Sequence, residues 1–364
     1  MIETGLYKSF FTLLKAGLWN TKPDLSYFPL NDQDWERLYS SARMQTVEAI
    51  VYDGVMQLPD ELLPPQLLLM RWTVQVDYIE HRNKQMNACM EELAGLFTEQ
   101  HIEFFLLKGQ GIAACYDVPL HRVCGDIDWF FPSVSDFNRA CRLIGAKGIR
   151  MVRQTRFSIA YEWKGVLVEH HKYMLDIHNP LVASFLKNIQ ESEQRNAVFL
   201  RMKGKHIQMP SPLLNHLCVN AHILKHLFMF GIGLRQICDS ARLCKAYCGR
   251  VDGKKLKKAY QKAGLYSWMQ QFNHLLVTDL GMPVSYLPFP LDARNNSRWI
   301  LQEVLEGGNF GFYSEHTAFK WGHGWRKRLY GLFHLVKYMR YVPLEVFSYL
   351  GVLIYSRIKN ELIS

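Results

Sequence analysis

The sequence lacks the patterns that would assign it to several common classes of protein. Its eight cysteines include no Cys-x-x-Cys pair, which argues against both a zinc ribbon and a disulfide framework. No low-complexity tract or internal repeat is present, and the N-terminus lacks the basic, apolar and small-residue order of a secretory signal. We therefore expect a globular, cytoplasmic protein with reduced thiols.

The composition allows large hydrophobic cores and favours anionic partners. With 364 residues, of which 49% are hydrophobic, the chain is long enough for two or three packed units. Its formal net charge of +10 favours nucleotides, nucleic acid or acidic lipid headgroups. A global charge does not choose among these partners, so the composition constrains only the sign of the partner's charge.

Three regions follow one another along the chain. Residues 1–100 have helical periodicity and predict a helical N-terminal lobe. Residues 101–210 contain strand patterns and predict a catalytic core, whereas residues 211–364 predict a helical C-terminal region with a basic, aromatic tail. This order predicts an α+β fold, in which a small mixed sheet is flanked by helical N-terminal and C-terminal regions.

Individual elements follow from local patterns. The expected strands cover residues 103–107, 128–131, 157–163 and 166–174. The expected helices include residues 66–100, 135–145, 213–230, 234–247 and 252–263. Lys164-Gly165 predicts a hairpin turn between the last two strands.

The most informative feature is a glycine turn followed by a strand with two acids. Gly109, Gln110 and Gly111 follow an apolar run, and the glycines permit a tight turn that approaches a phosphate closely. Asp126 and Asp128 come next, and side-chain alternation along a strand places them on one face. Two adjacent carboxylates repel, so a cation relieves the cost, and hard oxygen ligands suit Mg²⁺ bound together with substrate phosphates. The pattern predicts metal-assisted phosphoryl or nucleotidyl transfer.

The order of turn, helix and acid-x-acid strand resembles the nucleotidyltransferase fold shared by DNA polymerase beta and the aminoglycoside nucleotidyltransferases. Leu107-Lys108-Gly109, with Arg122 shortly before Gly125-Asp126-Ile127-Asp128, is similar to a bacterial group called uncharacterised nucleotidyltransferases. The resemblance implies a Mg²⁺-dependent enzyme, with Mn²⁺ as the alternative ion. Such an enzyme moves a nucleoside monophosphate from a nucleoside triphosphate to a small molecule, sugar or protein and releases pyrophosphate.

A site of this type needs a third acid on a neighbouring strand. Alternation along residues 166–173 places Glu169, His171 and Tyr173 on one face. The resemblance places an acid, followed two residues later by histidine, on this strand. We therefore expect Glu169 to be the third metal ligand and the general base, with Glu162 and Asp176 as alternatives.

Several residues are candidates for binding the phosphates. Backbone N–H groups at Gly109, Gln110 and Gly111, at the start of a helix, are expected to face them. Gln110 stands where the general motif has a glycine or serine, so a hydroxyl contact is missing. Lys108 is either a phosphate ligand or a solvated charge. The planar fork of Arg122 suits a triphosphate or an acidic acceptor, and the alternative is an arginine on the surface of a loop.

Other charged and aromatic features have structural explanations. His222 and His226 lie one turn apart on an expected helix, but no third ligand at a fixed spacing supports a zinc site, so we favour a packed or partner-facing surface. Arg235 and Asp239, also one turn apart, either contact substrate or form an ion pair.

The tail interleaves basic and aromatic residues from Trp325 to Lys359, and its apolar stretch at 346–355 is too short and broken to span a membrane. We favour packing of this stretch on the N-terminal lobe over peripheral contact with a membrane. The alternative function is a basic protein that binds nucleic acid or a membrane surface on a catalytically lapsed nucleotidyltransferase fold. No recognised nucleic-acid module supports it, so nucleic acid is the less favoured partner.

Overall fold

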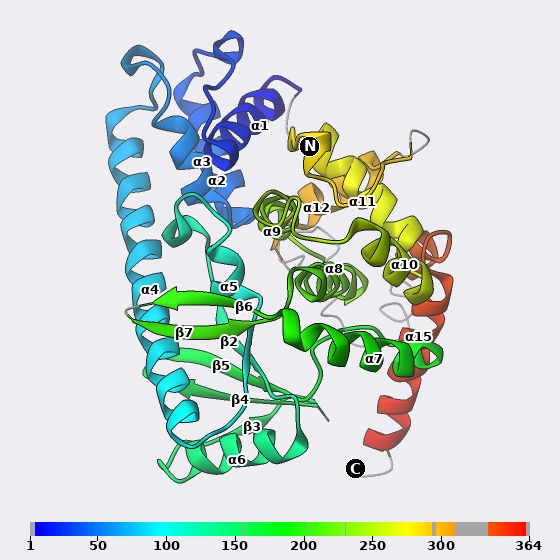
Figure 1. Ribbon diagram of the computed structural model, residues 1–364. Coiled ribbons are helices and arrows are strands. Elements are labelled where there is room, and N and C mark those ends of the chain that lie inside the picture. Colours follow the sequence, from blue (N-terminus) through cyan, green and yellow to red (C-terminus); the bar gives the residue numbers. More distant parts are fainter. Residues whose placement is uncertain are drawn as a thin grey trace.

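The computed structural model describes residues 4–155, 157–202, 204–229, 231–292, 296–309 and 334–361. A long helix, α4 (Gln66–Glu99), runs along one side of the molecule (Figure 1). It begins directly after Pro65, because proline fixes φ but cannot continue a preceding helical hydrogen-bond ladder. This element was correctly predicted from its periodicity.

Helix α4 contributes to two hydrophobic cores. Its first half buries Trp72 and Ile79 in a core made mainly of helices. Its second half buries Met90 and Phe97 in a core that lies against the sheet. One continuous helix therefore joins the helical part of the molecule to the part that carries the strands.

The N-terminal helices share the helical core with the first half of α4. They are α1 (Thr4–Trp19), α2 (Asp32–Met44) and α3 (Glu48–Val55). Helices α1 and α3 approach closely at two glycines, since a Cβ added to Gly17 would lie 1.8 Å from the carbonyl oxygen of Ile50 and one added to Gly54 would lie 2.0 Å from that of Leu13. These two positions admit no larger side chain without separating the helices.

The sheet has five strands in the order β1-β2-β5-β4-β3. The strands are β1 (Phe105–Leu107), β2 (Asp126–Phe130), β3 (Val152–Arg153), β4 (Ser158–Trp163) and β5 (Val166–His171). Strands β2 and β5 are parallel, and the other neighbouring pairs are antiparallel. The mixed sheet of the predicted α+β fold is confirmed. The predicted hairpin turn is also correct, because Lys164 and Gly165 both have positive φ, as a two-residue turn between β4 and β5 requires.

The two faces of the sheet have different neighbours. Ile127, Trp129 and Val168 point to the core formed with α4 and with α6 (Val134–Gly145), which is capped by the side chain of Ser133. On the opposite face, Phe105 and Phe130 join the helical core together with residues of α8 (Pro212–Met229). Strand alternation therefore places Asp126 and Asp128 on the face that looks toward α8.

The remaining elements follow the sheet in sequence. They are α7 (Ala183–Glu193), β6 (Val198–Met202), β7 (Lys205–Met209), α9 (Leu234–Ala246), α10 (Gly253–Ala263), α11 (Tyr266–Thr278), α12 (Arg298–Gly307) and α15 (Pro343–Glu361). The break between α8 and α9 was predicted, whereas the β6–β7 hairpin was not. Strand β2 begins two residues earlier than expected and β5 ends three residues earlier.

Part of the expected tail, Trp325–Tyr330, lies outside the described residues. The start of α15 packs on α8: Val346 is buried, and the Tyr349 ring lies 5.6 Å from that of Phe228. This contact differs from the expected one with the N-terminal lobe. Among the described residues, no helix combines the length and the apolarity that crossing a membrane requires.

A buried histidine on α8 makes stability depend on pH. Burial lowers the pKa of His216 from 6.5 to about 4, so the folded protein keeps this ring neutral at pH 5 while the unfolded chain protonates it. This contribution to stability is present above pH 6.5 and is lost as the pH falls toward 4. At pH 5 the loss is about 2 kcal/mol.

Urea unfolding tests this contribution. Between pH 7.5 and pH 5, the free energy of unfolding should fall by about 2 kcal/mol less in His216→Leu than in the wild type. The control His81→Leu, at an exposed position on α4, should lose as much as the wild type.

Candidate active site

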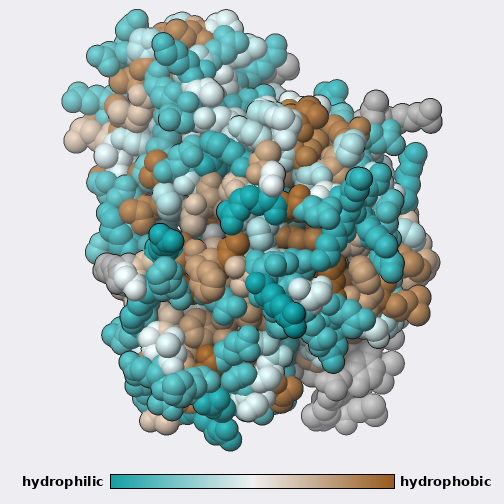
Figure 2. Space-filling model, viewed as in Figure 1, coloured by the Kyte–Doolittle hydropathy of each residue, from teal (hydrophilic) through white to brown (hydrophobic). Residues whose placement is uncertain are grey.

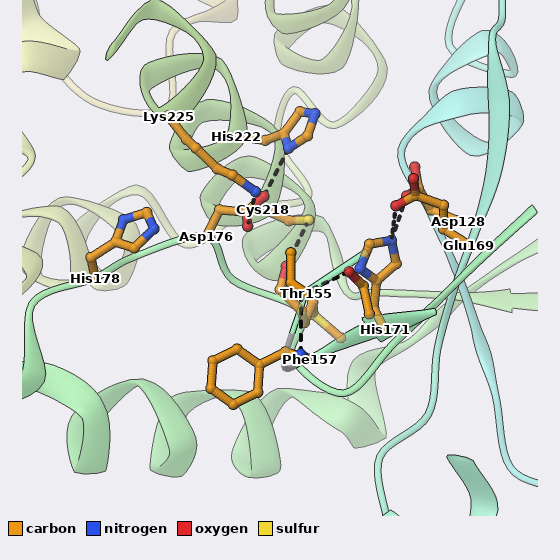
Figure 3. A network of polar contacts seen from close by, with 12 residues as sticks. Asp128, Thr155, Phe157, Glu169, His171, Asp176, His178, Cys218, His222 and Lys225 are labelled. Carbon is orange, nitrogen blue, oxygen red and sulfur yellow. Dashed lines mark hydrogen bonds and ion pairs between the residues drawn. The ribbon is translucent and has the colours of Figure 1, made fainter. Parts of the chain in front are cut away.

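The pairing of β2 with β5 brings the expected acids together. In this parallel pair Asp126 lies opposite Leu167 and Asp128 lies opposite Glu169. Residues directly opposite each other share a face, so the carboxylates of Asp128 and Glu169 are neighbours across the two strands. Figure 3 shows both side chains and that of His171 pointing to the same region.

Three of these side chains form a group that could hold a metal ion. One ligand atom from each of Asp128, Glu169 and His171 lies within 4.8 Å of the others. His171 Nε2 lies 2.6 Å from Asp128 Oδ1 and 3.3 Å from Glu169 Oε2. Asp128 is buried, whereas Glu169 and His171 are partly exposed, so the group opens on one side to an incoming ligand.

Burial and neighbouring charges shift the pKa values of the three carboxyl groups. Burial and the nearby charge of Asp128 raise the pKa of Asp126 to about 6. Burial, followed by Asp128, also raises the pKa of Glu169. Burial acts on Asp128 in the same direction, but the Lys108 ammonium and His171 outweigh it and hold the pKa of Asp128 below its ordinary value. Asp128 is therefore the charged centre of the group, and a cation would relieve the repulsion around it.

Lys108 lies inside the site. It precedes α5 (Gly109–Ala113) with φ at +43°, and its Nζ lies 3.5 Å from Asp128 Oδ1. Its side chain is 13% exposed, so the interpretation as a solvated charge is wrong. Although burial would lower the pKa of Lys108, Asp128 and Asp176 raise it, so the ammonium stays charged.

The glycine turn lies directly beside the acids. Gly109 has φ at +33°, and a Cβ at this position would lie 3.1 Å from the carbonyl oxygen of Asp126. The backbone of the turn therefore lies against the start of β2. The side chain of Gln110 points the other way, donating to Asn87 Oδ1 of α4 at 2.9 Å and accepting from the Cys124 thiol. Gly111 packs against Met209, whose sulfur would lie 2.8 Å from an added Cβ. The side chain of Gln110 is thus engaged by α4 and by the loop before β2.

Comparison with known proteins identifies the family. A model of the family described as uncharacterised nucleotidyltransferases matches residues 31–278, well over half of the chain. The chain belongs to this family. No curated protein matches the sequence. A solved structure, described as an antigenic nucleotidyltransferase-like protein from Paracoccidioides brasiliensis, is 16% identical with a TM-score of 0.37, and the similarity covers 57% of this chain and 93% of that one.

In this nucleotidyltransferase-family chain, Arg122 has a different environment from the one expected. Its Nε donates to Asp239 Oδ1 at 3.0 Å and its Nη2 donates to Asp239 Oδ2 at 2.6 Å. Both side chains are buried, so Arg122 is neither a surface arginine nor directed at the acids of β2. Asp239 therefore pairs with Arg122 and not with Arg235, which was one of the two alternatives for that pair, and Arg235 donates to the Val123 carbonyl at 2.7 Å. These contacts tie the loop before β2 to α9.

Sequence reasoning missed a second polar group, on α8 and the segment that follows β5. Asp176 accepts from the Nδ1 of His222 and from the Nζ of Lys225, both at 2.8 Å. Lys108 Nζ lies 3.4 Å from the same His222 nitrogen, so this group adjoins the acids (Figure 3). The signal in the sequence was the pair His222 and His226, but helical spacing alone could not show that Asp176 lies beside it. Of the two alternatives to Glu169, Asp176 belongs to this second group and Glu162 is exposed on β4.

The buried pair of Arg122 and Asp239 predicts a specific pattern of stability. Arg122→Met leaves the Asp239 carboxylate buried without its counter-ion, so the free energy of unfolding should fall by about 3–5 kcal/mol. The double variant Arg122→Met/Asp239→Leu should recover most of that loss, because no buried charge is left alone. Urea denaturation of the wild type, Arg122→Met and the double variant measures these free energies of unfolding. As a matched control, Arg139→Met, in the more exposed pair with Asp136, should cost less than about 1 kcal/mol. If Arg122→Met and Arg139→Met lowered the free energy of unfolding equally, the structural role of Arg122 would be contradicted.

Proposed function

We propose that the protein is a divalent-metal-dependent nucleotidyltransferase that moves a nucleoside monophosphate from a nucleoside triphosphate to an acceptor hydroxyl or amine and releases pyrophosphate. Membership of the family supports the class of reaction. The observation that carries the proposal is the register of β2 and β5, which sets Asp128 opposite Glu169 on the face that also bears Asp126. Asp128 and Glu169 lie together with His171, and Asp126 is two residues before Asp128 on the same face of β2.

The residues present fit a hard divalent cation. Carboxylate oxygens are the ligands that Mg²⁺ and Mn²⁺ favour. Burial, followed by the charge of Asp128, raises the pKa values of Asp126 and Glu169, and a bound cation would favour the charged forms of both. Asp126, Asp128 and Glu169 would hold the ion. When bound, such an ion neutralises charge on the triphosphate and stabilises the attacking and leaving oxygens.

The side chains around the acids orient them and attract the nucleotide. His171 contacts both Asp128 and Glu169 and so fixes the direction of their oxygens. The Lys108 ammonium lies 3.5 Å from Asp128 Oδ1, and it would become available to a phosphate once a bound metal ion neutralises Asp128. The backbone at Gly109 lies against Asp126, so a triphosphate beside the turn meets both amide donors and the acids.

Removing the two acids of β2 tests the proposal directly. Thermal unfolding of the wild type with ATP, CTP, GTP or UTP should show stabilisation that requires Mg²⁺, worth about 2.7 kcal/mol at a nucleotide concentration of 100 times Kd. Asp126→Asn/Asp128→Asn should lose this stabilisation, because neutral amides do not hold the metal and its triphosphate. Glu162→Gln removes an exposed carboxylate from the same sheet and should behave as the wild type does. A double variant that keeps the full Mg²⁺-dependent shift would refute the proposed site.

Glu169 can be examined separately through the metal requirement. Glu169→Gln keeps the shape of the side chain but removes one charged ligand, so the Mg²⁺ concentration that gives half of the nucleotide-induced shift should rise at least about tenfold, as expected for a lost metal-site interaction. A titration of Mg²⁺ at fixed nucleotide concentration measures this midpoint. An unchanged midpoint would remove Glu169 from the ligand set.

A further inference from the structure

The group formed by Asp176, His222 and Lys225 faces the acids across Lys108. Asp176 follows β5, whereas His222 and Lys225 lie on α8. Lys108 Nζ lies 3.5 Å from Asp128 Oδ1 and 3.4 Å from His222 Nδ1, so one ammonium separates the two groups. Figure 3 shows the carboxylates of the sheet and the imidazole of His222 on opposite sides of the same region.

The contacts of His222 determine which ring nitrogen carries the proton. His222 Nδ1 lies 2.8 Å from Asp176 Oδ2 and 3.4 Å from the Lys108 ammonium. Because the contact with the carboxylate is the shorter one and a carboxylate at neutral pH only accepts hydrogen bonds, we place the ring proton on Nδ1. The lone pair is then on Nε2, which points away from Asp176 (Figure 3). Lys225 donates to the other oxygen of Asp176 at 2.8 Å and holds the carboxylate in place. The ring is therefore oriented on one side and available as an acceptor on the other.

The surroundings keep this imidazole neutral but within reach of a substrate. Burial, with the charge of Lys108, lowers the pKa of His222 to about 4, so the ring is unprotonated near pH 7. Its side chain is 26% exposed, in contrast to the buried His216 on the same helix. The neighbouring ring of His226 lies 4.3 Å away at 74° and limits rotation.

We infer that His222 is the general base that removes the proton from the acceptor, with Asp176 as its positioning residue; this rests on the proposed nucleotidyl transfer. The acceptor oxygen or nitrogen forms a bond to the α-phosphorus, while its proton passes to His222 Nε2. The bond from that phosphorus to the bridging oxygen breaks, and pyrophosphate leaves with the electron pair. Asp176 stabilises the imidazolium that results, which then returns its proton to water.

This assignment separates two tasks that sequence reasoning had given to Glu169. Glu169 belongs to the group with Asp128 and His171, in which one ligand atom from each residue lies within 4.8 Å of the others. His222 lies outside that group, beside Asp176. The acids of the sheet are then free to hold the metal, while a neutral base from α8 handles the acceptor proton.

The test compares nucleotide binding with turnover in His222→Gln. Binding is the Mg²⁺-dependent thermal shift with each of the four nucleoside triphosphates, and turnover is pyrophosphate release with water or with hydroxylamine as the acceptor. We expect His222→Gln to keep the shift but to release pyrophosphate to water about 100-fold or more slowly, the usual effect of losing a general base. Transfer to hydroxylamine should fall much less, because a neutral amine, unlike water, is a good nucleophile before it loses a proton. Asp176→Asn should show the same pattern more weakly, and His206→Gln, at an exposed position on β7, should match the wild type.

The outcomes distinguish this inference from the proposed function. A wild type without any Mg²⁺-dependent shift contradicts the nucleotidyltransferase itself. If the wild type binds and turns over, the inference is overturned by equal rates for His222→Gln and wild type, by loss of the shift in the variant, or by equal losses with water and hydroxylamine. A wild type that binds nucleotide but releases no pyrophosphate to either acceptor also contradicts an oriented base at this position.

Discussion

The parallel pairing of β2 with β5 is the interaction on which the candidate site depends. Antiparallel neighbours are joined by short turns, but this pair requires a crossover, which α6, β3 and β4 supply between residues 131 and 165. The register sets Asp128 opposite Glu169, and a slip of one residue would turn one strand's acids into the core with Trp129 or Val168. The buried face of the sheet, packed on α4 and α6, therefore fixes the chemistry of the other face.

Charge balance is the second constraint. Several carboxylates converge near the sheet, and their repulsion is tolerated because cationic groups enter from other elements. Lys108 comes from a turn with positive φ, at a cost that its contact with Asp128 offsets. Lys225 comes from α8 and pairs with Asp176. The acids of β2 and β5 therefore lie on one side of Lys108, and the neutral His222 of α8 lies on the other.

Local patterns in the sequence predicted the acids and their shared face, because a period of two depends only on the strand itself. Alternation was enough to place Glu169 and His171 together. Alternation could not show where the side chains of Gln110 and Arg122 point, because they are directed by Asn87 and Asp239, residues distant in the sequence. It also failed for His222, since helical spacing identifies neighbours on one helix but not the carboxylate that another segment brings to them. Side-chain contacts between distant segments were thus the information that the sequence did not provide.

The two sides of the site are held by different parts of the molecule. The acids rest on a sheet backed by the second half of α4, whereas the segment after Asp176 is fixed by α15. Glu345 of α15 accepts from the backbone N–H groups of His178 and Asn179. Because β5 leads within five residues from His171 to Asp176, the chain itself couples the two sides. The separation between the acids of the sheet and His222 therefore depends on the hydrophobic core that Phe105 and Phe130 share with residues of α8.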